Sequence, residues 1–329
     1  MNFTRMMSLL MVGTLFAPAA LAAEGVHNWN FTMIHKTNNV DNVSLMEEFA
    51  DRVAKRTDGK LMINITPGGE SSGGYYGTYT TINQVHTGDY EMSQIPVKSF
   101  IHTSSDLDVL DMPMLFRSHE HASAVLDGKV GKDLMQTVYN GSNGNLRGLD
   151  FTYSGGFRHI YTLDDVQSLS ELEGKTSWVP TTRMGKDALE LLDVNLDMRN
   201  KPFIDGHFNA GYKVGQGETV RLKEQWESAE AQYDEADKET LQMKTVIETK
   251  HSLYLTMLTV NEEAFQELTK NQQKVLQEEA NWLAKQERDL SIQQEVENKA
   301  LLEANGVKFL EPSLEDKNLL PAMGEKGHK

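Results

Sequence analysis

The sequence contains no cysteine among its 329 residues. No disulfide can therefore stabilise the fold, no thiol can act as a nucleophile, and no cysteine can carry a lipid anchor. Long apolar runs are missing too, because no stretch of eighteen consecutive apolar residues is present. A membrane-spanning helix needs about 20 such residues, so we expect no membrane insertion. The G-x-S-x-G motif of serine hydrolases is also absent.

Basic residues are scarce. The chain has 32 Lys and Arg against 48 Asp and Glu, which gives a formal net charge of -16 and a pI of about 5.1. Nucleic acids and anionic lipids need a basic face, so neither is an expected partner. A negatively charged ligand would need a locally positive cleft in this acidic protein, and each well-placed arginine is therefore informative.

The N-terminus has the pattern of a secretory signal. Arg5 provides the positive charge, residues 8–20 form an apolar run, and residues 20–22 read Ala-Leu-Ala, a small-x-small cleavage site. The sequence therefore predicts a signal peptide over residues 1–22, cleavage near Ala22 and a periplasmic mature protein. The remaining length is sufficient for two lobes, each with its own core.

Hydrophobic spacing predicts alternating strands and helices at the start of the mature chain. Residues 28–34 and 61–65 alternate as strands, residues 43–53 repeat at helical spacing before Gly59, and a short helix ends at Gly88. This order predicts an α/β fold with a mixed sheet and helices on both faces.

One long helix is predicted near the C-terminus, over about 269–305. Thr269 and Gln272 have the spacing of a capping box, and Gly306 would end the helix. At 1.5 Å per residue the helix would be about 50 Å long, which is longer than one lobe. It must brace both lobes or form a coiled coil, and a brace fits better because the heptad pattern is not sustained.

The segment 153–182 carries the most informative motifs. It contains a Gly-Gly-Phe-Arg sequence and, after a polar turn, a short strand that ends at a proline. It resembles the substrate-binding subunits of TRAP transporters, which have a Gly-x-Arg segment followed by an "s-x-x-D-L-x-G-x-K-x-R-V-P" segment. Residues that match are Gly155, Gly156, Arg158, Leu172, Gly174, Val179 and Pro180. Residues 49–65, 82–92 and 107–134 are also similar to family segments.

The resemblance implies a two-lobed solute-binding protein with mixed sheets, crossing strands and a long helix that spans both lobes. It implies a monomer that closes on a small carboxylate-bearing or zwitterionic solute and delivers it to TRAP permease subunits, with no catalysis and no cofactor. The expected divisions are residues 23–153 with about 243–268 for lobe I, and 154–242 with about 285–329 for lobe II.

Candidate ligand contacts come from loops that would face the cleft and from the resemblance. They are His35, Tyr76, Gln94, Arg158, Trp178, Thr181, Arg183, Glu224 and Gln225. Glu224 and Gln225 belong to residues 219–225, which we aligned with a family strand reading V-D-G-Q-E-N. Purely structural roles stay open for four of these residues. Arg158 could pair with a nearby carboxylate, His35 could cap a strand, Trp178 could pack in the core, and Tyr76 could lie at the rim of the cleft.

Trp178 stands where the family has its carboxylate-binding arginine. A bidentate arginine–carboxylate pair in a dry cleft is lost with this change. Either Arg158 or Arg183 takes over the carboxylate, or the ligand is not a typical dicarboxylate. A zwitterion, a quaternary ammonium acid or an aromatic acid would use the tryptophan face.

A metal site is not expected. His119 and His121 are two residues apart on a predicted helix, so their rings point to different sides. Asp106, Asp108 and Asp111 lack the glycine and glutamate of a calcium loop.

Two rival functions remain: presentation of a ligand to a membrane sensor kinase, and a secreted hydrolase whose catalytic residues carry no recognised motif.

Overall fold

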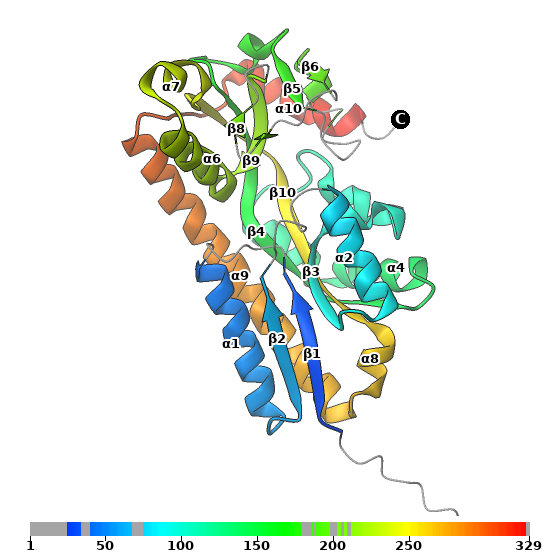
Figure 1. Cartoon of the computed structure of the whole chain (residues 1–329). Helices are drawn as coiled ribbons and strands as arrows, with labels where there is room; N and C mark the ends of the chain where they lie inside the picture. The colour runs from blue at the N-terminus through cyan, green and yellow to red at the C-terminus, as the bar shows by residue number, and fades with distance from the viewer. Residues whose placement is uncertain are drawn as a thin grey trace, which may run out of the picture.

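The computed structural model describes residues 25–33, 40–67, 75–178, 186, 189–197, 203–204, 207–208 and 212–326. Two lobes lie one above the other, and strands β4 and β10 and helix α9 run from one to the other (Figure 1). These connecting elements span Leu146–Thr162, Thr245–Asn261 and Lys270–Ala304. The two-lobed α/β fold with crossing strands is confirmed. In the described part of the chain, no helix is both long and apolar enough to cross a membrane.

The first lobe is built on the βαβ order predicted from residue spacing. Apolar residues of α1, such as Phe49 and Val53, pack with Phe31 of β1 and Leu61 of β2 in one continuous core. The other face is covered by short helices. The elements of the first lobe, besides the connecting ones, are β1 His27–Thr32, α1 Val40–Arg56, β2 Leu61–Thr66, α2 Tyr75–Thr87, β3 Met92–Pro96, η2 Val97–His102, η3 Ser105–Asp111, α3 His119–Leu126, α4 Lys129–Gly141 and α8 Glu262–Glu267.

The second lobe is smaller than the first and contains the last helix of the described chain. Figure 1 shows α6, α7 and α10 around the strands at this end of the molecule. Its elements are η4 Leu169–Leu172, β5 Thr176–Trp178, β6 Asn195–Asp197, β7 Phe203–Ile204, β8 His207–Phe208, β9 Val214–Glu218, α6 Thr219–Gln232, α7 Glu235–Leu241, β11 Lys308–Leu310 and α10 Leu314–Lys326.

A nine-stranded mixed sheet continues through both lobes, in the order β2-β1-β3-β10-β4-β9-β5-β6, with β11 beside β10. Strand β1 is parallel to both β2 and β3, and β5 is parallel to both β6 and β9. The central pairs β3–β10, β10–β4 and β4–β9 are antiparallel, and β11 is parallel to β10. The long strands β4 and β10 therefore belong to both lobes, and any movement of the lobes must bend them.

The pairing of β4 with β10 is interrupted at two places in its middle. Residues 154–156 of β4 lie opposite the single residue Tyr254, and residues 248–251 of β10 lie opposite His159. Backbone with positive φ permits both irregularities, at Gly155 (96°), Gly156 (81°) and Lys250 (47°). Such bulges bend and twist strands locally, and these lie where the chain passes between the lobes.

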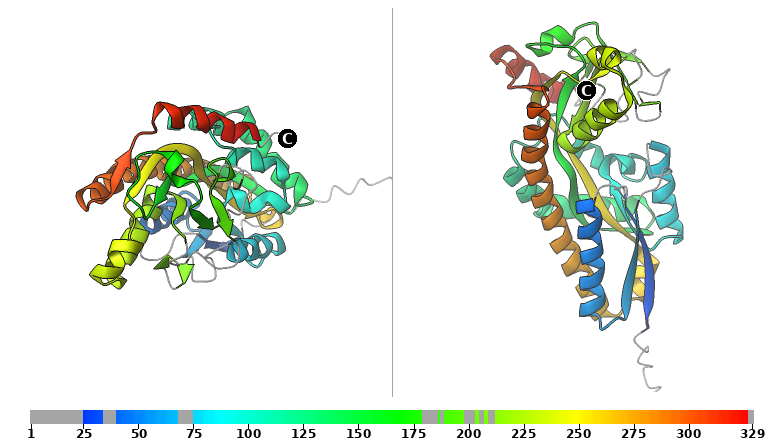
Figure 2. Two further views of the ribbon diagram at one scale, coloured as in Figure 1. Left: turned by 90° about the horizontal axis from the view of Figure 1, so that it is seen from above. Right: turned by 60° about the vertical axis from the view of Figure 1, so that its left-hand side comes forward.

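Helix α9 starts with the predicted capping box: Thr269 accepts from the Gln272 backbone N–H, and the Gln272 side chain accepts from that of Thr269. The helix packs on α1 in the first lobe and α6 in the second. Figure 2 shows it along one flank of both lobes.

The alignment of residues 219–225 with a family strand was wrong. These residues form the first half of α6, and the strand is β9, which directly precedes them. The strand is extended by pairing with β4, where Arg158 lies opposite Glu218. Residues 221–231 are rich in Leu, Lys, Glu, Gln and Ala, which favour a helix.

Candidate functional site

Arg158 lies in the middle of β4, two residues after the bulge that contains Gly155 and Gly156. Its Nη2 donates to the backbone oxygen of Gln216 on β9 at 3.3 Å. Its Nε is buried and has no partner in the part of the chain that the structure describes. The guanidinium is therefore held at one end and retains an unused buried donor.

A buried histidine holds the β9 segment against which Arg158 rests. His251 Nε2 lies 2.8 Å from the side-chain oxygen of Gln216, and its Nδ1 lies 2.7 Å from the Thr249 hydroxyl. Burial, and then the charge of Arg158, lower the pKa of His251 well below its usual value. A neutral imidazole with both nitrogens engaged fixes Gln216, and hence the position of Arg158.

Lys98 and Tyr254 complete a charged cluster with Arg158. Lys98 belongs to η2 of the first lobe, and its Nζ lies 5.1 Å from the centre of the Tyr254 ring. The Arg158 Cζ lies 5.8 Å from the same ring centre. Both cations are within the range of cation–π attraction, so the tyrosine ring supports two like charges at once.

Glu218 is the contribution of the second lobe to this cluster, and it is the last residue of β9. A Cβ added at Gly155 would lie 2.3 Å from the Glu218 Cγ, so the absence of a side chain at Gly155 makes room for this glutamate. Arg221 follows in the first turn of α6. We use the name cation cluster for Lys98, Arg158 and Arg221 with Glu218 and Tyr254.

The electrostatics of the cation cluster are those of a site with incomplete charge pairing. Burial, and then repulsion by Arg158, lower the pKa of Lys98 to about 8. Burial raises the pKa of Glu218, and the attraction of Arg158 only partly opposes this. Burial raises the pKa of Tyr254 to about 12, with Glu218 adding to the rise. An additional negative charge between Lys98 and Arg158 would stabilise the charged forms of both.

Two predicted contact residues lie outside this cluster. Gln94 is buried, and its amide donates to the Thr152 hydroxyl at 3.0 Å and to the Glu287 carboxylate at 2.6 and 2.8 Å. It thus connects β3 with β4 and α9. Glu224 is exposed on α6, 3.5 Å from the Arg221 guanidinium.

Gln225 lies on the buried side of α6, next to the cluster. Its side chain hydrogen-bonds to Tyr161. Burial raises the pKa of Tyr161, and Arg221, Gln225 and Arg158 oppose this in part. The Gln225 Oε1 is buried without a partner among the described residues. Of the predicted residues, the structure therefore brings Gln225 and Arg158 into one neighbourhood.

The remaining predicted contacts cannot be placed in the same way. His35, Thr181 and Arg183 lie outside the described residues. Trp178 is the last residue of β5 and pairs with Asp197, and Tyr76 is in the first turn of α2. The side chains of Trp178 and Tyr76 lie outside the described part of the structure.

Sequence reasoning missed Lys98, Glu218 and Tyr254 as individual site residues. Nothing in the sequence relates Lys98 to Arg158, which is 60 positions further on. A signal for Glu218 was present, because β9 reads Val-Gly-Gln-Gly-Glu and contains the Val, Gly, Gln and Glu of the family segment. Glu218, and not Glu224, therefore stands at the end of this strand.

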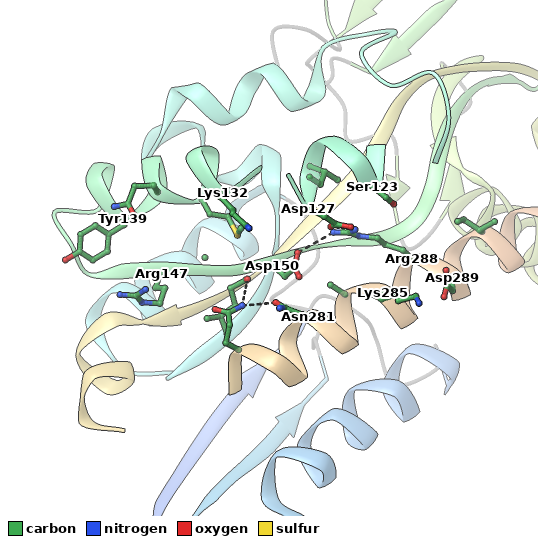
Figure 3. Close-up of a pocket in the computed structure, with 18 residues that line it drawn as sticks. Ser123, Asp127, Lys132, Tyr139, Arg147, Asp150, Asn281, Lys285, Arg288 and Asp289 are labelled. Carbon is green, nitrogen blue, oxygen red and sulfur yellow. Dashed lines mark hydrogen bonds and ion pairs between the residues drawn. The ribbon is translucent and has the colours of Figure 1, made fainter. Parts of the chain in front are cut away.

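A separate groove of about 750 Å³ lies between α4, β4 and α9, away from Arg158 (Figure 3). Its arginines are already paired: Arg147 forms a double hydrogen bond with Glu262 at 2.7 Å, and Arg288 contacts Asp127 and Asp150. Both arginines of the groove already have carboxylate partners. A ligand anion would therefore add less to their stabilisation than it would in the cation cluster.

The two neighbouring histidines have different partners, as their spacing predicted. His119 Nε2 lies 2.9 Å from Glu295 of α9, whereas His121 Nδ1 accepts from the Arg117 backbone N–H at 3.3 Å. Ser118 caps α3 by accepting from the His121 backbone. Within the described residues, no group of three or more His, Asp or Glu side chains is placed to hold a metal ion.

Comparison with known proteins shows the family to which this chain belongs. The sequence profile of the family "Bacterial extracellular solute-binding protein, family 7" matches residues 31–197 and 231–329. The chain belongs to this family, so the resemblance noted in segment 153–182 is confirmed.

Individual relatives are more distant. The 2,3-diketo-L-gulonate-binding periplasmic protein YiaO of Escherichia coli is 30% identical over 124 residues, which are 37% of this chain and 35% of that protein. The match thus spans about a third of the relative's length. The chain as a whole is similar in fold to TRAP periplasmic solute-binding proteins of known structure.

Two solved structures illustrate the fold. The protein from Haemophilus influenzae, with bound L-gulonate, has a TM-score of 0.76 and 16% identity and covers 92% of each chain. The protein from Citrobacter koseri, with bound D-glucuronate, has a TM-score of 0.74 and 20% identity, with 92% of this chain and 94% of that chain covered. The family and these neighbours are binding proteins.

Proposed function

We propose that this protein is the periplasmic solute-binding subunit of a TRAP-type transporter and that it captures a small organic acid at the cation cluster. The observation that carries the proposal is the placement of Lys98, Arg158 and Glu218, which come from the first lobe, a crossing strand and the second lobe. A ligand held there would contact both lobes. The named ligands of relatives, diketogulonate, gulonate and glucuronate, support an acid that also bears hydroxyl groups.

Capture would proceed by closure of the lobes about the bulges of β4 and β10. The moving units would be residues 23–153 with about 243–268 and residues 154–242 with about 285–329, while α9 connects them. The mature protein would start near Ala23, act as a monomer, leave the solute chemically unchanged and release it to the membrane permease. Arg158 would hold the carboxylate, and Trp178, Thr181, Arg183, Gln225, His35 and Tyr76 would line the closed cleft.

Two measurements test this proposal. A thermal-shift screen over sugar acids, dicarboxylates, betaines and neutral sugars should find stabilisation by acids and none by neutral sugars. Small-angle scattering with a stabilising acid should show a smaller radius of gyration than without it, because the lobes close. Binding of neutral sugars alone, or an unchanged radius at saturation, would contradict the proposal.

A further inference from the structure

Lys98 is in an unusual environment for a lysine. It is half-buried, and in the described part of the chain its ammonium forms no ion pair and contacts the face of Tyr254. The charged and titratable groups that face it are Arg158 on β4, Asp111 on η3, Glu218 on β9, Arg221 on α6 and Tyr254 on β10. After burial, repulsion by Arg158 has the largest influence on the pKa of Lys98.

We propose that Lys98 supplies the second cation of the ligand site, in place of the arginine that the resemblance expects at Trp178, and that Lys98 and Arg158 together bind the carboxylate of a hydroxyl-bearing monoanionic acid. This inference rests on the proposed function. Arg158 offers a buried, unused Nε donor, and Lys98 offers a point charge from the opposite lobe. A carboxylate has two oxygens, so one can accept from each cation.

Glu218 gives the site a second kind of selectivity. Its carboxylate is an acceptor that has not formed an ion pair with Arg158 among the described residues, although the two attract each other. A second ligand carboxylate near Glu218 would be repelled, whereas a hydroxyl could donate to it. The cluster therefore favours one carboxylate and neighbouring hydroxyls over a dicarboxylate.

Binding of the acid must be coupled to the protonation of Lys98. Burial and Arg158 lower the pKa of this ammonium to about 8 in the free protein, and a bound carboxylate would raise it again. Above pH 8 the lysine must therefore take up a proton from solvent when the acid binds. With a pKa of 8, the charged fraction falls about tenfold between pH 7 and pH 9, and the affinity should fall by the same factor.

The test uses calorimetry with D-glucuronate and L-gulonate at pH 7 and pH 9. Wild-type protein should bind more weakly by about tenfold at pH 9. Lys98→Arg should bind comparably to wild type at pH 7 and keep that affinity at pH 9, because arginine stays protonated. Lys98→Met should bind at least about tenfold more weakly at pH 7 and show little further change with pH.

Two controls separate a binding role from a structural one. Lys132→Met removes an exposed lysine of the same lobe in the groove of Figure 3 and should bind as wild type does. Ligand-free Lys98→Met should melt no lower than wild type, because it removes a poorly paired charge. A much lower melting temperature together with unchanged affinity would assign Lys98 a structural role and overturn the inference.

The outcomes distinguish the proposed capture of an acid from the proposed role of Lys98 in it. If the acids bind but Lys98→Met retains wild-type affinity, or the pH dependence persists in Lys98→Arg, the role of Lys98 is wrong and acid capture stands. If no acid of the screen binds to wild-type protein, acid capture itself fails, and the role of Lys98 fails with it.

Discussion

Charged residues are paired very differently in two regions of this protein. Where α9 lies on the first lobe, Glu279 is 1% exposed and receives hydrogen bonds from Arg52 at 2.5 Å and Arg56 at 2.6 Å. Arg288 is 7% exposed and contacts Asp127, Asp150 and the Phe151 carbonyl. In the cation cluster, by contrast, Lys98 and Arg158 share one tyrosine ring and repel each other.

The difference follows from how buried charges are stabilised. An ion pair away from water is tolerable only when its partners and hydrogen bonds are complete. The contacts of Glu279 with Arg52 and Arg56 satisfy this requirement within the chain, so they fix α9 on the first lobe. Although burial alone would raise the pKa of Glu279, the hydrogen bonds from Arg56 and Arg52 lower it below its ordinary value. The cation cluster does not satisfy this requirement, and a ligand anion would supply what is missing. Paired charges thus mark the scaffold, and incompletely paired charges mark the site.

The largest effect on stability is expected where the paired region is broken. Arg288→Met would leave the Asp150 carboxylate without its cationic partner and would remove the guanidinium that donates to the Phe151 carbonyl. We expect a loss of about 3–5 kcal/mol in the free energy of unfolding, measured by urea denaturation. The matched variant Lys285→Met removes an exposed cation from the same helix and groove and should change stability by less than about 0.5 kcal/mol. Similar losses in the two variants would show that pairing at Arg288 is unimportant.

The reverse pattern is expected at the site. Arg158→Lys keeps the charge but removes the planar set of donors, so acid affinity should fall by about 2–5 kcal/mol in calorimetry. Folding stability should change little. Arg147→Lys, in the outer groove with its partner Glu262, is the control and should keep wild-type affinity. An affinity change below about 0.5 kcal/mol for Arg158→Lys would make this arginine structural.

The pH dependence of stability tests Asp150, a carboxyl group whose burial is offset only in part by its neighbour Arg288. Burial, opposed by Arg288, raises the pKa of Asp150 to about 6 from 3.8. The folded state therefore binds this proton more tightly, and the stabilisation from protonated Asp150 is full below pH 3.8 and lost as the pH rises through 6. Asp150→Asn should remove about 2 kcal/mol of that decline. Urea denaturation between pH 4 and pH 7.5 measures it, with the exposed Asp289→Asn as control. Parallel curves for wild type and Asp150→Asn would contradict the raised pKa.

A smaller effect is expected at Trp178. If the indole contacts the ligand in a desolvated cleft, Trp178→Ala should reduce the affinity for the bound acid by about 1–2 kcal/mol. Trp178→Arg should improve the affinity for succinate and malate, which we expect wild-type protein to bind weakly. Tight succinate binding by wild-type protein, measured by the same calorimetry, would show that other cations already accommodate a dicarboxylate.

The parts of the fold that depend on local spacing were predictable. The capping box of α9 needs only Thr269 and Gln272, and the first strands and helix follow from apolar residues at periods of 2 and 3.6. Helix propensity also predicts α6, in conflict with the alignment of its first residues with a family strand. Local propensity was the better guide at residues 219–225.

The site was predictable only in part. Arg158 could be found because glycines and a family motif mark it in the sequence. The association of Lys98, Glu218 and Tyr254 with it depends on the bulges in β4 and β10, which shift the pairing of the long strands. Such shifts are set by tertiary packing, and no short sequence pattern reports which lysine will face which arginine.

The most direct test of the contrast between the two regions is a crystal structure of the protein with D-glucuronate. We expect one ligand carboxylate within hydrogen-bonding distance, about 2.7–3.2 Å, of both Arg158 and Lys98, with the ion pairs of α9 unchanged. A ligand bound in the groove of Figure 3, or a carboxylate in the cleft that contacts neither Arg158 nor Lys98, would contradict it.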